Sequence, residues 1–390
     1  MSTGDDLLHE ARDRLDAAMQ SRGLWPEGSA WVRGAMAGFP RHRFAPDVVW
    51  EWDGWRWVAV DREREPGRWA ALVYPEPQDS TVTQVTDGLS TSSLSCTQVV
   101  ADMLDSLMLE PGQSVVELGT GSGWNAALLA YRVGPEGRVV SVETDAGLAR
   151  AAAERLATAG ARVEVRTGDG TAGIAGLEPA DRLVATYAVE TVPGAWIEQV
   201  RPGGRVVFPW GRLGHFALTV AEDGKSATGW LQGLATFMSD RHETGTATSP
   251  ALAPEGEEAV DDQEMFEDLT GGHLLFALRV SHPGIVVSVE GSGAQARIRL
   301  REEPSGRSAL VERADGGLVA VSGEGRELWA ALRAGYRLWC KRGRPEQWDF
   351  GMTVSSAGQT VWIHDPVSGP YAGGAPGRTT LRSLPVTPSE

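Results

Sequence analysis

The chain is poor in the features that mark export, metal binding or membrane insertion. Its 390 residues include only two cysteines, Cys96 and Cys340, which lie far apart and lack the Cys/His spacing of a zinc site. No apolar stretch is long enough to span a bilayer, and the acidic N-terminus lacks the pattern of a secretory signal. We therefore expect reduced thiols, no metal site, no membrane association and a cytoplasmic location.

Basic charge is also scarce. The chain has 36 Lys and Arg residues against 52 Asp and Glu, which gives a formal net charge of −16. Nucleic-acid phosphates and anionic lipids both require a basic face. We therefore expect no nucleic-acid partner, and the length leaves room for two domains.

Glycine, by contrast, is concentrated in one informative segment. Residues 115 to 124 read Val-Val-Glu-Leu-Gly-Thr-Gly-Ser-Gly-Trp, an apolar strand that runs into a turn with Gly119, Gly121 and Gly123 at alternate positions. Glycines allow a tight strand-to-helix turn and the close approach of a nucleotide. Dinucleotide sites prefer G-x-G-x-x-G, whose third glycine would here be Trp124. The variant therefore favours S-adenosylmethionine over NAD.

An acid follows at the spacing that such a site requires. Glu143 stands 20 residues beyond Gly123, at the end of a second apolar run that begins at Gly137. A carboxylate in that place can accept hydrogen bonds from both ribose hydroxyls. The spacing thus supports a nucleoside cofactor.

The segment from residue 99 to residue 209 alternates between helix and strand patterns, as in a parallel, doubly wound sheet. Ligands of such sheets lie beyond the carboxyl ends of the strands, where the glycine turn, Glu143, Asp169 and Thr186 all fall. The expected strands cover residues 114–118, 138–142, 162–166, 180–186 and 204–209, with helices at 99–109, 124–133, 148–159 and 196–200. An antiparallel pair, 215–220 and 229–237, follows them.

Composition divides the chain. We expect a catalytic domain over residues 1–238, an acidic linker over 239–268 that contains almost no large apolar residues, an α+β domain over 269–375, and a flexible tail over 376–390. In the second domain the patterns predict strands at 274–280, 285–289, 296–300, 310–313 and 318–321, a helix at 327–341, and a hairpin at 350–363. We expect this domain to recognise a peptide.

Two helices, 5–22 and 30–38, and a tryptophan-rich hairpin, 48–60, precede the parallel sheet. A two-residue turn at Asp53-Gly54 would place Trp52 opposite Trp55 and Trp50 opposite Trp57, with all four indoles on one face. That face either packs against the neighbouring domain or forms an aromatic platform for a peptide.

Further motifs carry a resemblance to a family. They are Arg41-His-Arg-Phe-Ala-Pro46, the hydroxyl-rich segment 89–97, Gly168-Asp-Gly170, and the segments 181–193 and 201–209. Together with the glycine turn and Glu143, they resemble the protein-L-isoaspartate O-methyltransferases, in the same order, from about residue 7 to residue 238. The resemblance implies a Rossmann-like fold and S-adenosylmethionine-dependent carboxyl methylation.

The resemblance also implies roles for individual residues. Ser95, with Ser93, would lie beside the acceptor carboxylate as the catalytic pair; the alternative is that Ser95 only caps the following helix. Glu143 would bind the ribose, and Asp169 would face the adenine. The residues expected to hold the cofactor are Glu117, Gly119, Thr120, Gly121, Gly123, Trp124, Glu143, Asp169, Gly170 and Thr186.

Three of those assignments have structural alternatives. Glu117 either reaches the cofactor's amino group through water or satisfies backbone donors of the turn. Trp124 either packs under the methionine end of the cofactor or belongs to the core. Asp169, between two glycines, is either an adenine contact or a simple turn residue.

The acceptor side departs from the family. Where repair enzymes usually read Gln-Thr-Ile-Ser-Ala-Pro, this chain has Ser92-Ser-Leu-Ser-Cys-Thr97, and where they read Thr-Ala-Ala-Pro it has Thr186-Tyr-Ala-Val189. We infer the same reaction on a different carboxylate. The longer chain resembles methyltransferases encoded with ATP-grasp (graspetide) or lanthipeptide maturation systems, which implies a macrocyclic precursor peptide as partner and an aspartimide as product.

Two alternatives stay open. One is the repair of isoaspartate in damaged proteins. The other is a non-catalytic peptide-binding subunit that has kept the fold.

Overall fold

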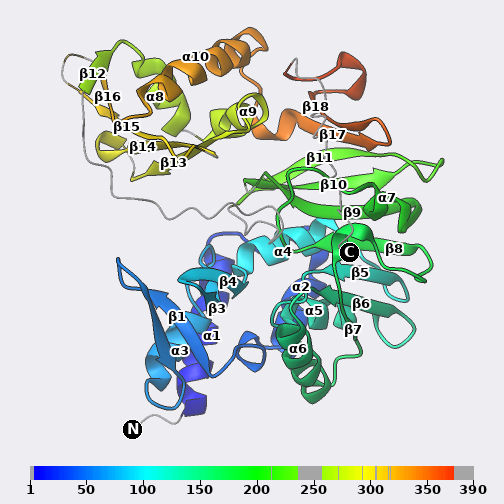
Figure 1. The fold of residues 1–390 in the computed structure, drawn as a ribbon. Coiled ribbons are helices and arrows are strands. Elements are labelled where there is room, and N and C mark those ends of the chain that lie inside the picture. Colours follow the sequence, from blue (N-terminus) through cyan, green and yellow to red (C-terminus); the bar gives the residue numbers. More distant parts are fainter. Residues whose placement is uncertain are drawn as a thin grey trace, which may run out of the picture.

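A nine-stranded sheet forms the centre of the molecule. The computed structural model describes residues 4–211, 213–235, 257–270, 272–291, 293–303, 305–314, 316 and 318–372. The strand order of the sheet is β18-β17-β11-β10-β9-β8-β5-β6-β7 (Figure 1). Its parallel part consists of β5 (Ser114–Leu118), β6 (Arg138–Glu143), β7 (Glu164–Thr167), β8 (Ala180–Ala185) and the start of β9 (Val200–Trp210).

Helices alternate with these strands as the sequence predicts. They are α4 (Thr97–Ser106), α5 (Trp124–Val133), α6 (Ala146–Ala159), the short η3 (Gly170–Ala172) and α7 (Gly194–Glu198). The strands β10 (Gly214–Val220) and β11 (Ala227–Leu234) then continue the sheet in antiparallel fashion. The Rossmann-like, doubly wound fold is thus confirmed, and the carboxyl ends of β5, β6 and β8 meet at one edge.

The N-terminal part packs against this sheet with three helices and a sheet of its own. The helices are α1 (Gly4–Ser21), α2 (Trp31–Gly38) and α3 (Pro66–Val73), with the short η1 (Glu27–Ser29) and η2 (Arg41–Arg43). The four antiparallel strands are β1 (Val48–Trp52), β2 (Trp57–Asp61), β3 (Thr81–Thr86) and β4 (Leu89–Leu94), in the order β2-β1-β3-β4. The hydroxyl-rich segment before α4 is therefore mostly strand.

The tryptophan hairpin has a longer turn than expected. Trp52 pairs with Trp57, and Trp50 pairs with Ala59, so the turn contains four residues instead of two. The cause is the carboxylate of Asp53, whose Oδ1 accepts hydrogen bonds from the backbone N–H groups of residues 55 and 56 at 2.8 and 2.9 Å. The expected register, with all four indoles on one face, is therefore wrong.

Burial of this aromatic face against a neighbouring domain is also wrong for the outer part of the hairpin. Trp55 is 90% exposed and Trp52 is 51% exposed. The rings of Trp52 and Trp57 meet edge to face, with centroids 5.4 Å apart. The outer hairpin is an exposed aromatic surface.

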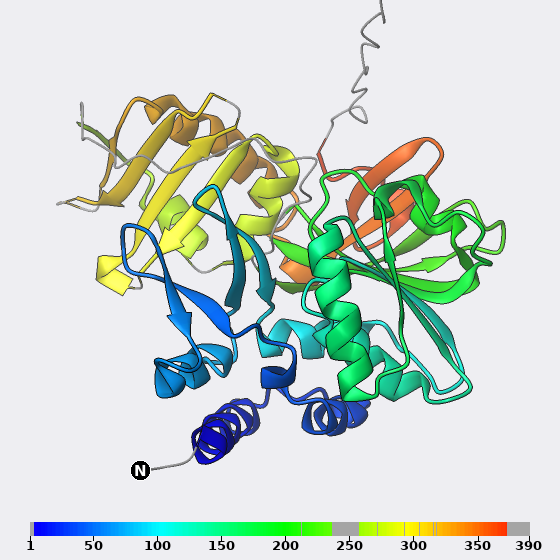
Figure 2. The same cartoon turned by 60° about the horizontal axis from the view of Figure 1, so that its bottom comes forward.

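The C-terminal part contains a five-stranded antiparallel sheet in the order β12-β16-β15-β14-β13. Its strands are β12 (Glu257–Val260), β13 (Ile285–Glu290), β14 (Arg297–Glu302), β15 (Ser308–Arg313) and β16 (Val319–Ser322), with η4 (Gly293–Gln295). Its helices are α8 (Gln263–Thr270), α9 (His273–Ser281) and α10 (Arg326–Lys341). Figures 1 and 2 show this sheet and the N-terminal sheet on the same side of the central sheet.

Three expectations for this part differ from the structure. Residues 257–268 of the expected linker 239–268 contain β12 and most of α8, while residues 236–256 lie outside the described residues. The segment 274–280 is not a strand but belongs to α9, in which Leu274, Phe276, Ala277 and Leu278 are all buried. A short apolar run of this kind has no periodicity that separates a buried strand from a buried helix.

The third difference concerns the hairpin of β17 (Phe350–Ser355) and β18 (Gly358–Ile363), preceded by η6 (Gln347–Asp349) and followed by η7 (Pro366–Ser368). β17 pairs with β11, so the hairpin extends the central sheet and is not part of a separate domain 269–375. The tail 376–390 lies outside the described residues.

Aromatic side chains join the C-terminal part to the central sheet. Phe276 of α9 packs against Trp210 and Phe216 at centroid distances of 5.9 Å, and against Phe350 of β17 at 5.0 Å. All four rings belong to one buried cluster that extends through both parts. The two parts therefore share a core.

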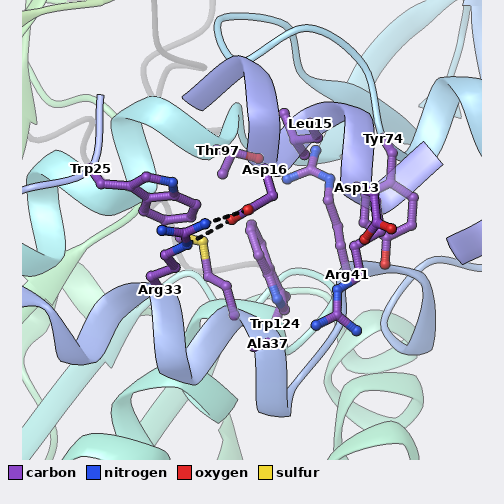
Figure 3. Close-up of a pocket in the computed structure, with 12 residues that line it drawn as sticks. Asp13, Leu15, Asp16, Trp25, Arg33, Ala37, Arg41, Tyr74, Thr97 and Trp124 are labelled. Carbon is purple, nitrogen blue, oxygen red and sulfur yellow. Dashed lines mark hydrogen bonds and ion pairs between the residues drawn. The ribbon is translucent and has the colours of Figure 1, made fainter. Parts of the chain in front are cut away.

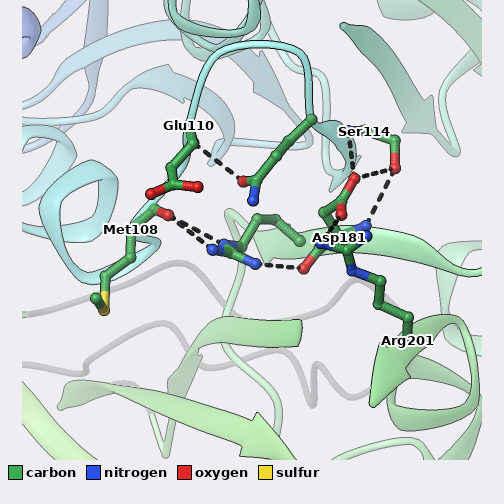
Figure 4. Close-up of polar contacts among 7 residues, drawn as sticks. Met108, Glu110, Ser114, Asp181 and Arg201 are labelled. Carbon is green, nitrogen blue, oxygen red and sulfur yellow. Dashed lines mark hydrogen bonds and ion pairs between the residues drawn. The ribbon is translucent and has the colours of Figure 1, made fainter. Parts of the chain in front are cut away.

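The amino ends of the parallel strands are closed by polar contacts away from the glycine turn. Asp181 of β8 accepts hydrogen bonds from the backbone N–H and the hydroxyl of Ser114 at 2.7 and 2.8 Å, and it pairs with Arg201 (Figure 4).

None of the helices in the described ranges combines the length and the apolar character needed to cross a bilayer.

Candidate active site

The glycine turn after β5 is as tight as its sequence requires. Gly119, Gly121 and Gly123 have φ angles of 94°, 53° and 91°, in the left-handed region that favours glycine. A Cβ on Gly119 would lie 2.4 Å from the hydroxyl of Thr186 and 3.0 Å from the ring of Tyr187. Thr186 Oγ1 donates to the carbonyl of Gly119 at 2.7 Å, which links the turn to the end of β8.

Glu143 braces the same turn from β6. Its carboxylate is 6% exposed, and it accepts hydrogen bonds from the backbone N–H of Gly121 at 2.8 Å and of Asp145 at 3.1 Å. A carboxylate has about four acceptor positions, so hydroxyl groups can still bind it. The turn and Glu143 therefore fit a ribose, and the glycines leave room for the rest of the nucleoside.

Glu117 does not satisfy backbone donors of the turn, which is one of its two expected roles. The other expected role, a contact with the cofactor's amino group through water, stays a prediction. Glu117 is fully buried, and its carboxylate accepts hydrogen bonds from Asn125 Nδ2 at 2.8 Å and from the hydroxyl of Ser141. Ser141 in turn contacts the hydroxyl of Thr120 at 2.6 Å. Burial raises the pKa of Glu117 to about 7. The side chains of Glu117 and Thr120 therefore stabilise the turn through a buried network of hydrogen bonds.

Asp169 and Gly170 follow β7 at the same edge of the sheet. Asp169 is exposed, and its Oδ1 accepts from the backbone N–H and the hydroxyl of Thr171 at 2.8 and 2.7 Å. Asp169 therefore makes the contacts expected of a simple turn residue. Because its side chain is exposed, the expected contact with the adenine stays a prediction. Gly170 is buried, and a Cβ there would lie 2.9 Å from Leu118.

Trp124 belongs to the core, which is the structural alternative stated for it, and packing under the methionine end of the cofactor stays a prediction. Its side chain is 3% exposed and its Nε1 donates to the carbonyl of Phe39 at 2.9 Å. The guanidinium of Arg41 lies over the ring of Trp124, with its Cζ 4.8 Å from the ring centroid. An aromatic residue at a helix start was an ambiguous signal, and here packing against the N-terminal segment prevails.

The acceptor loop, residues 92–97, connects β4 to α4. The N-cap of α4 is Cys96, and no side chain caps it. Ser95 therefore does not cap this helix. Its backbone carbonyl and that of Leu94 accept hydrogen bonds from Arg41 at 2.6 and 2.9 Å.

Sequence reasoning chose Ser93 and missed its neighbour. Ser92 and Leu94 are buried, while Ser93 between them is partly exposed. The hydroxyl of Ser92 lies 3.7 Å from the position that a Cβ on Gly121 would occupy. Strand alternation would have separated the two serines if residues 89–94 had been assigned to a strand.

The hairpin of β3 and β4 reaches over to the ribose end of the site. Gln84 Nε2 donates to Oδ2 of Asp145 at 3.3 Å, and Thr91 donates to Gln84 at 2.9 Å. Asp145 is also the N-cap of α6. The hairpin that leads into the acceptor loop is thus joined to the start of α6, two residues after Glu143.

A cavity of about 220 Å³ lies among the N-terminal helices (Figure 3). Trp124 and Thr97 line it, but the three glycines, Glu143 and Asp169 do not. Arg33 and Asp16 form a two-bonded ion pair at its wall. Within the described ranges, no group of His, Cys, Asp or Glu side chains is arranged to hold a metal ion.

The doubly wound sheet, the glycine turn and the acid at the end of β6 define a methyltransferase that uses S-adenosylmethionine. Residues 67–229 match the family model described as protein-L-isoaspartate(D-aspartate) O-methyltransferase (PCMT). The protein-L-isoaspartate O-methyltransferase of Methanopyrus kandleri is 33% identical over 213 residues, which cover 54% of this chain and 81% of that protein.

The corresponding enzyme of Hyperthermus butylicus is 38% identical over 233 residues, which cover 57% of this chain and 85% of that protein. The chain therefore belongs to the protein-L-isoaspartate O-methyltransferase family. A solved structure of a protein-L-isoaspartate O-methyltransferase has a TM-score of 0.51 and 18% identity, with coverage of 93% of this chain and 100% of that one. This likeness shows the fold alone.

Proposed function

We propose that the chain methylates the side-chain carboxylate of an aspartate in a ribosomally made, macrocyclic peptide. The next backbone nitrogen then attacks the carbonyl carbon of the product ester and displaces methanol, which takes up the nitrogen's proton. This closes an aspartimide ring. The observation that carries the proposal is a cofactor side with the family's glycines and acid, next to an acceptor side with a changed sequence.

Tyr187 is the clearest change on the acceptor side. It stands where repair enzymes usually have alanine, and its ring packs against Gly119 and meets Trp196 edge to face at 6.1 Å. An aromatic ring at this place changes the shape of the space beside the glycine turn. A changed shape supports an acceptor other than a linear isoaspartyl peptide.

The acceptor needs no general base from the protein. At neutral pH, the ionised form of a carboxyl group with a pKa of about 3.9 outnumbers the protonated form by about a thousand to one. Its oxygen is therefore already a nucleophile. When bound, S-adenosylmethionine supplies an electrophilic methyl group. The protein's part is to hold the carboxylate in line and to exclude water, which contributes on the order of 7 to 11 kcal/mol.

Mass spectrometry of a cyclised, aspartate-containing precursor peptide incubated with the protein and S-adenosylmethionine tests the proposal. We expect a gain of one methyl group, or a loss of one water once the aspartimide has formed. The uncyclised precursor is the matched control and should react more slowly. Methylation of only free isoaspartyl peptides would contradict the proposal.

Repair of isoaspartate is the second candidate. It is favoured by the names of the relatives, whose matches cover 81% and 85% of their own length. Repair predicts methylation of short linear isoaspartyl peptides by the protein alone.

A further inference from the structure

We infer that Arg41 is a positioning residue, which holds the acceptor loop at a fixed place relative to the cofactor turn. This inference rests on the proposed methyl transfer. Arg41 lies in η2, between α2 and β1, and it is 2% exposed. No carboxylate pairs with it among the described residues.

The guanidinium makes its hydrogen bonds to three different segments. Its Nη1 donates to the carbonyl of Ser95 at 2.6 Å, and its Nη2 donates to the carbonyl of Leu94 at 2.9 Å and to the hydroxyl of Thr81 at 3.1 Å. Its Nε donates to the carbonyl of Val73 at 2.8 Å. The planar fork of arginine spans this set of acceptors, whereas the point charge of lysine does not.

The same residue also contacts the cofactor side. Its guanidinium lies over the ring of Trp124, the first residue of the helix that follows the glycine turn. Phe39, two residues before Arg41, also contacts Trp124: its backbone carbonyl accepts a hydrogen bond from Trp124 Nε1. Residues 39–41 therefore fix the loop that carries Ser95 and the start of α5 to one another.

Methyl transfer makes this link consequential. The reacting oxygen must lie in line with the methyl group, and misplacement by about 1 Å costs on the order of a hundred-fold in rate. Burial lowers the pKa of Arg41 to about 10, so the group stays charged at neutral pH. Its charge and its hydrogen bonds are thus maintained while the enzyme works.

Arg41→Lys keeps the charge but cannot keep all of the hydrogen bonds. We expect kcat to fall at least about ten-fold, with the Kd for S-adenosylmethionine changed less than about three-fold, because the glycine turn and Glu143 are untouched. If Arg41 acts through the acceptor loop, its effect and that of Ser95→Ala will not add in the double variant. Unchanged kcat in Arg41→Lys, or full additivity, would overturn the inference.

Arg182 offers a matched control. Its guanidinium also donates to backbone carbonyls, those of Met108 and Asp181 at 2.9 to 3.2 Å, but at the amino ends of the strands. Arg182→Lys should lower the melting temperature about as much as Arg41→Lys while leaving kcat within about two-fold. Equal losses of kcat in both variants would show that Arg41 is only structural.

Alkylation of Cys96 tests the inference without any substrate. Cys96 follows Ser95 directly and Cys340 lies in α10, and both thiols are free and partly buried. The rate of alkylation by iodoacetamide is measured for each cysteine by peptide mass spectrometry. Arg41→Lys should raise the alkylation rate of Cys96 at least five-fold, which corresponds to a loss of about one kcal/mol in the protection that the closed loop gives this thiol. The rate at Cys340 should not change, and Arg182→Lys should change neither rate.

An unchanged Cys96 rate in Arg41→Lys would overturn the inference. If the wild-type protein methylates no peptide at all, the proposed function fails instead. The alkylation rates then still decide whether Arg41 holds the loop, so the two failures are distinguishable.

Discussion

Glu143 is the side chain that we expect to hold the cofactor most directly. Glu143→Ala should weaken S-adenosylmethionine binding by about 1 to 3 kcal/mol, the range for charge-assisted hydrogen bonds to ribose hydroxyls. Isothermal titration calorimetry measures the change. Glu222→Ala, at an exposed turn between β10 and β11, is the control and should bind normally. Unaltered affinity in Glu143→Ala would remove Glu143 from the cofactor site.

We expect Ser95 to act on the other half of the reaction, the acceptor carboxylate. Ser95→Ala should lower kcat at least about ten-fold, because one hydrogen bond that orients the carboxylate is lost, and should leave the cofactor Kd nearly unchanged. Steady-state kinetics and calorimetry on the same preparation measure both. Ser93→Ala, measured in the same way, tests whether the second serine of the expected pair shares the role. A parallel loss of kcat and of cofactor affinity in Ser95→Ala would indicate a purely structural role.

Glu117 should give the folded protein a distinctive dependence on pH. Its pKa is raised to about 7 by burial, above the ordinary value of 4.5 that applies to an unfolded chain. The folded state therefore binds a proton that the unfolded state has lost, so stability falls as pH rises from 4.5 to about 7 and is flat above 7. The shift corresponds to about 3 kcal/mol.

Glu117→Gln keeps the partners of Glu117 and removes this titration. Denaturant unfolding across pH 4 to 8 should show that the variant gains about 3 kcal/mol relative to wild type between the two ends of the window. The comparison also cancels His215, whose pKa is lowered to about 4 by burial and which therefore destabilises both proteins alike as pH falls below 6.5. A constant difference between the two proteins would contradict the assignment.

The tryptophan hairpin remains a candidate platform for the peptide substrate. Trp52 contributes little to stability because half of it faces solvent. If a peptide packs on it, Trp52→Ala should raise the KM for the peptide about two- to ten-fold, ~0.5–1.5 kcal/mol of aromatic contact. Trp348→Ala, equally exposed at 51%, is the control. A KM that is equal in both variants would exclude the platform.

Patterns within a segment predicted most of the elements, and errors arose where partners are distant. The alternation of helix and strand from α4 to β9 and the tight glycine turn could be read from local sequence. The pairing of β17 with β11 could not, because nothing near residues 350–355 specifies a partner more than a hundred residues away. The hairpin turn is a local exception, because hydrogen bonds to the Asp53 side chain lengthened a turn that the Asp-Gly pair predicted to be short.

The candidate site divides in the same way. Backbone requirements marked the glycines, and strand ends marked Glu143 and Asp169. No local pattern indicates that Arg41 contacts Ser95, since 54 residues separate them. Side-chain contacts between distant segments, as those of Glu117 and Trp124 also show, depend on the packed core.

The shared core predicts that the C-terminal part and the central sheet unfold together. Phe276 is fully buried between β9, β10 and β17. Phe276→Ala should therefore destabilise the protein by about 3 to 5 kcal/mol while leaving a single transition in calorimetry. Trp348→Ala serves as a control on the surface. Two separate transitions in the wild-type protein would show that the parts fold independently.

A crystal structure of the full chain with S-adenosylhomocysteine tests the central claim most directly. We expect the ribose hydroxyls on Glu143, the nucleoside against the turn of Gly119 to Gly123, and the sulfur directed at the acceptor loop that carries Ser95. A ligand bound elsewhere, or no ligand at saturating concentration, would contradict this account of how the protein works.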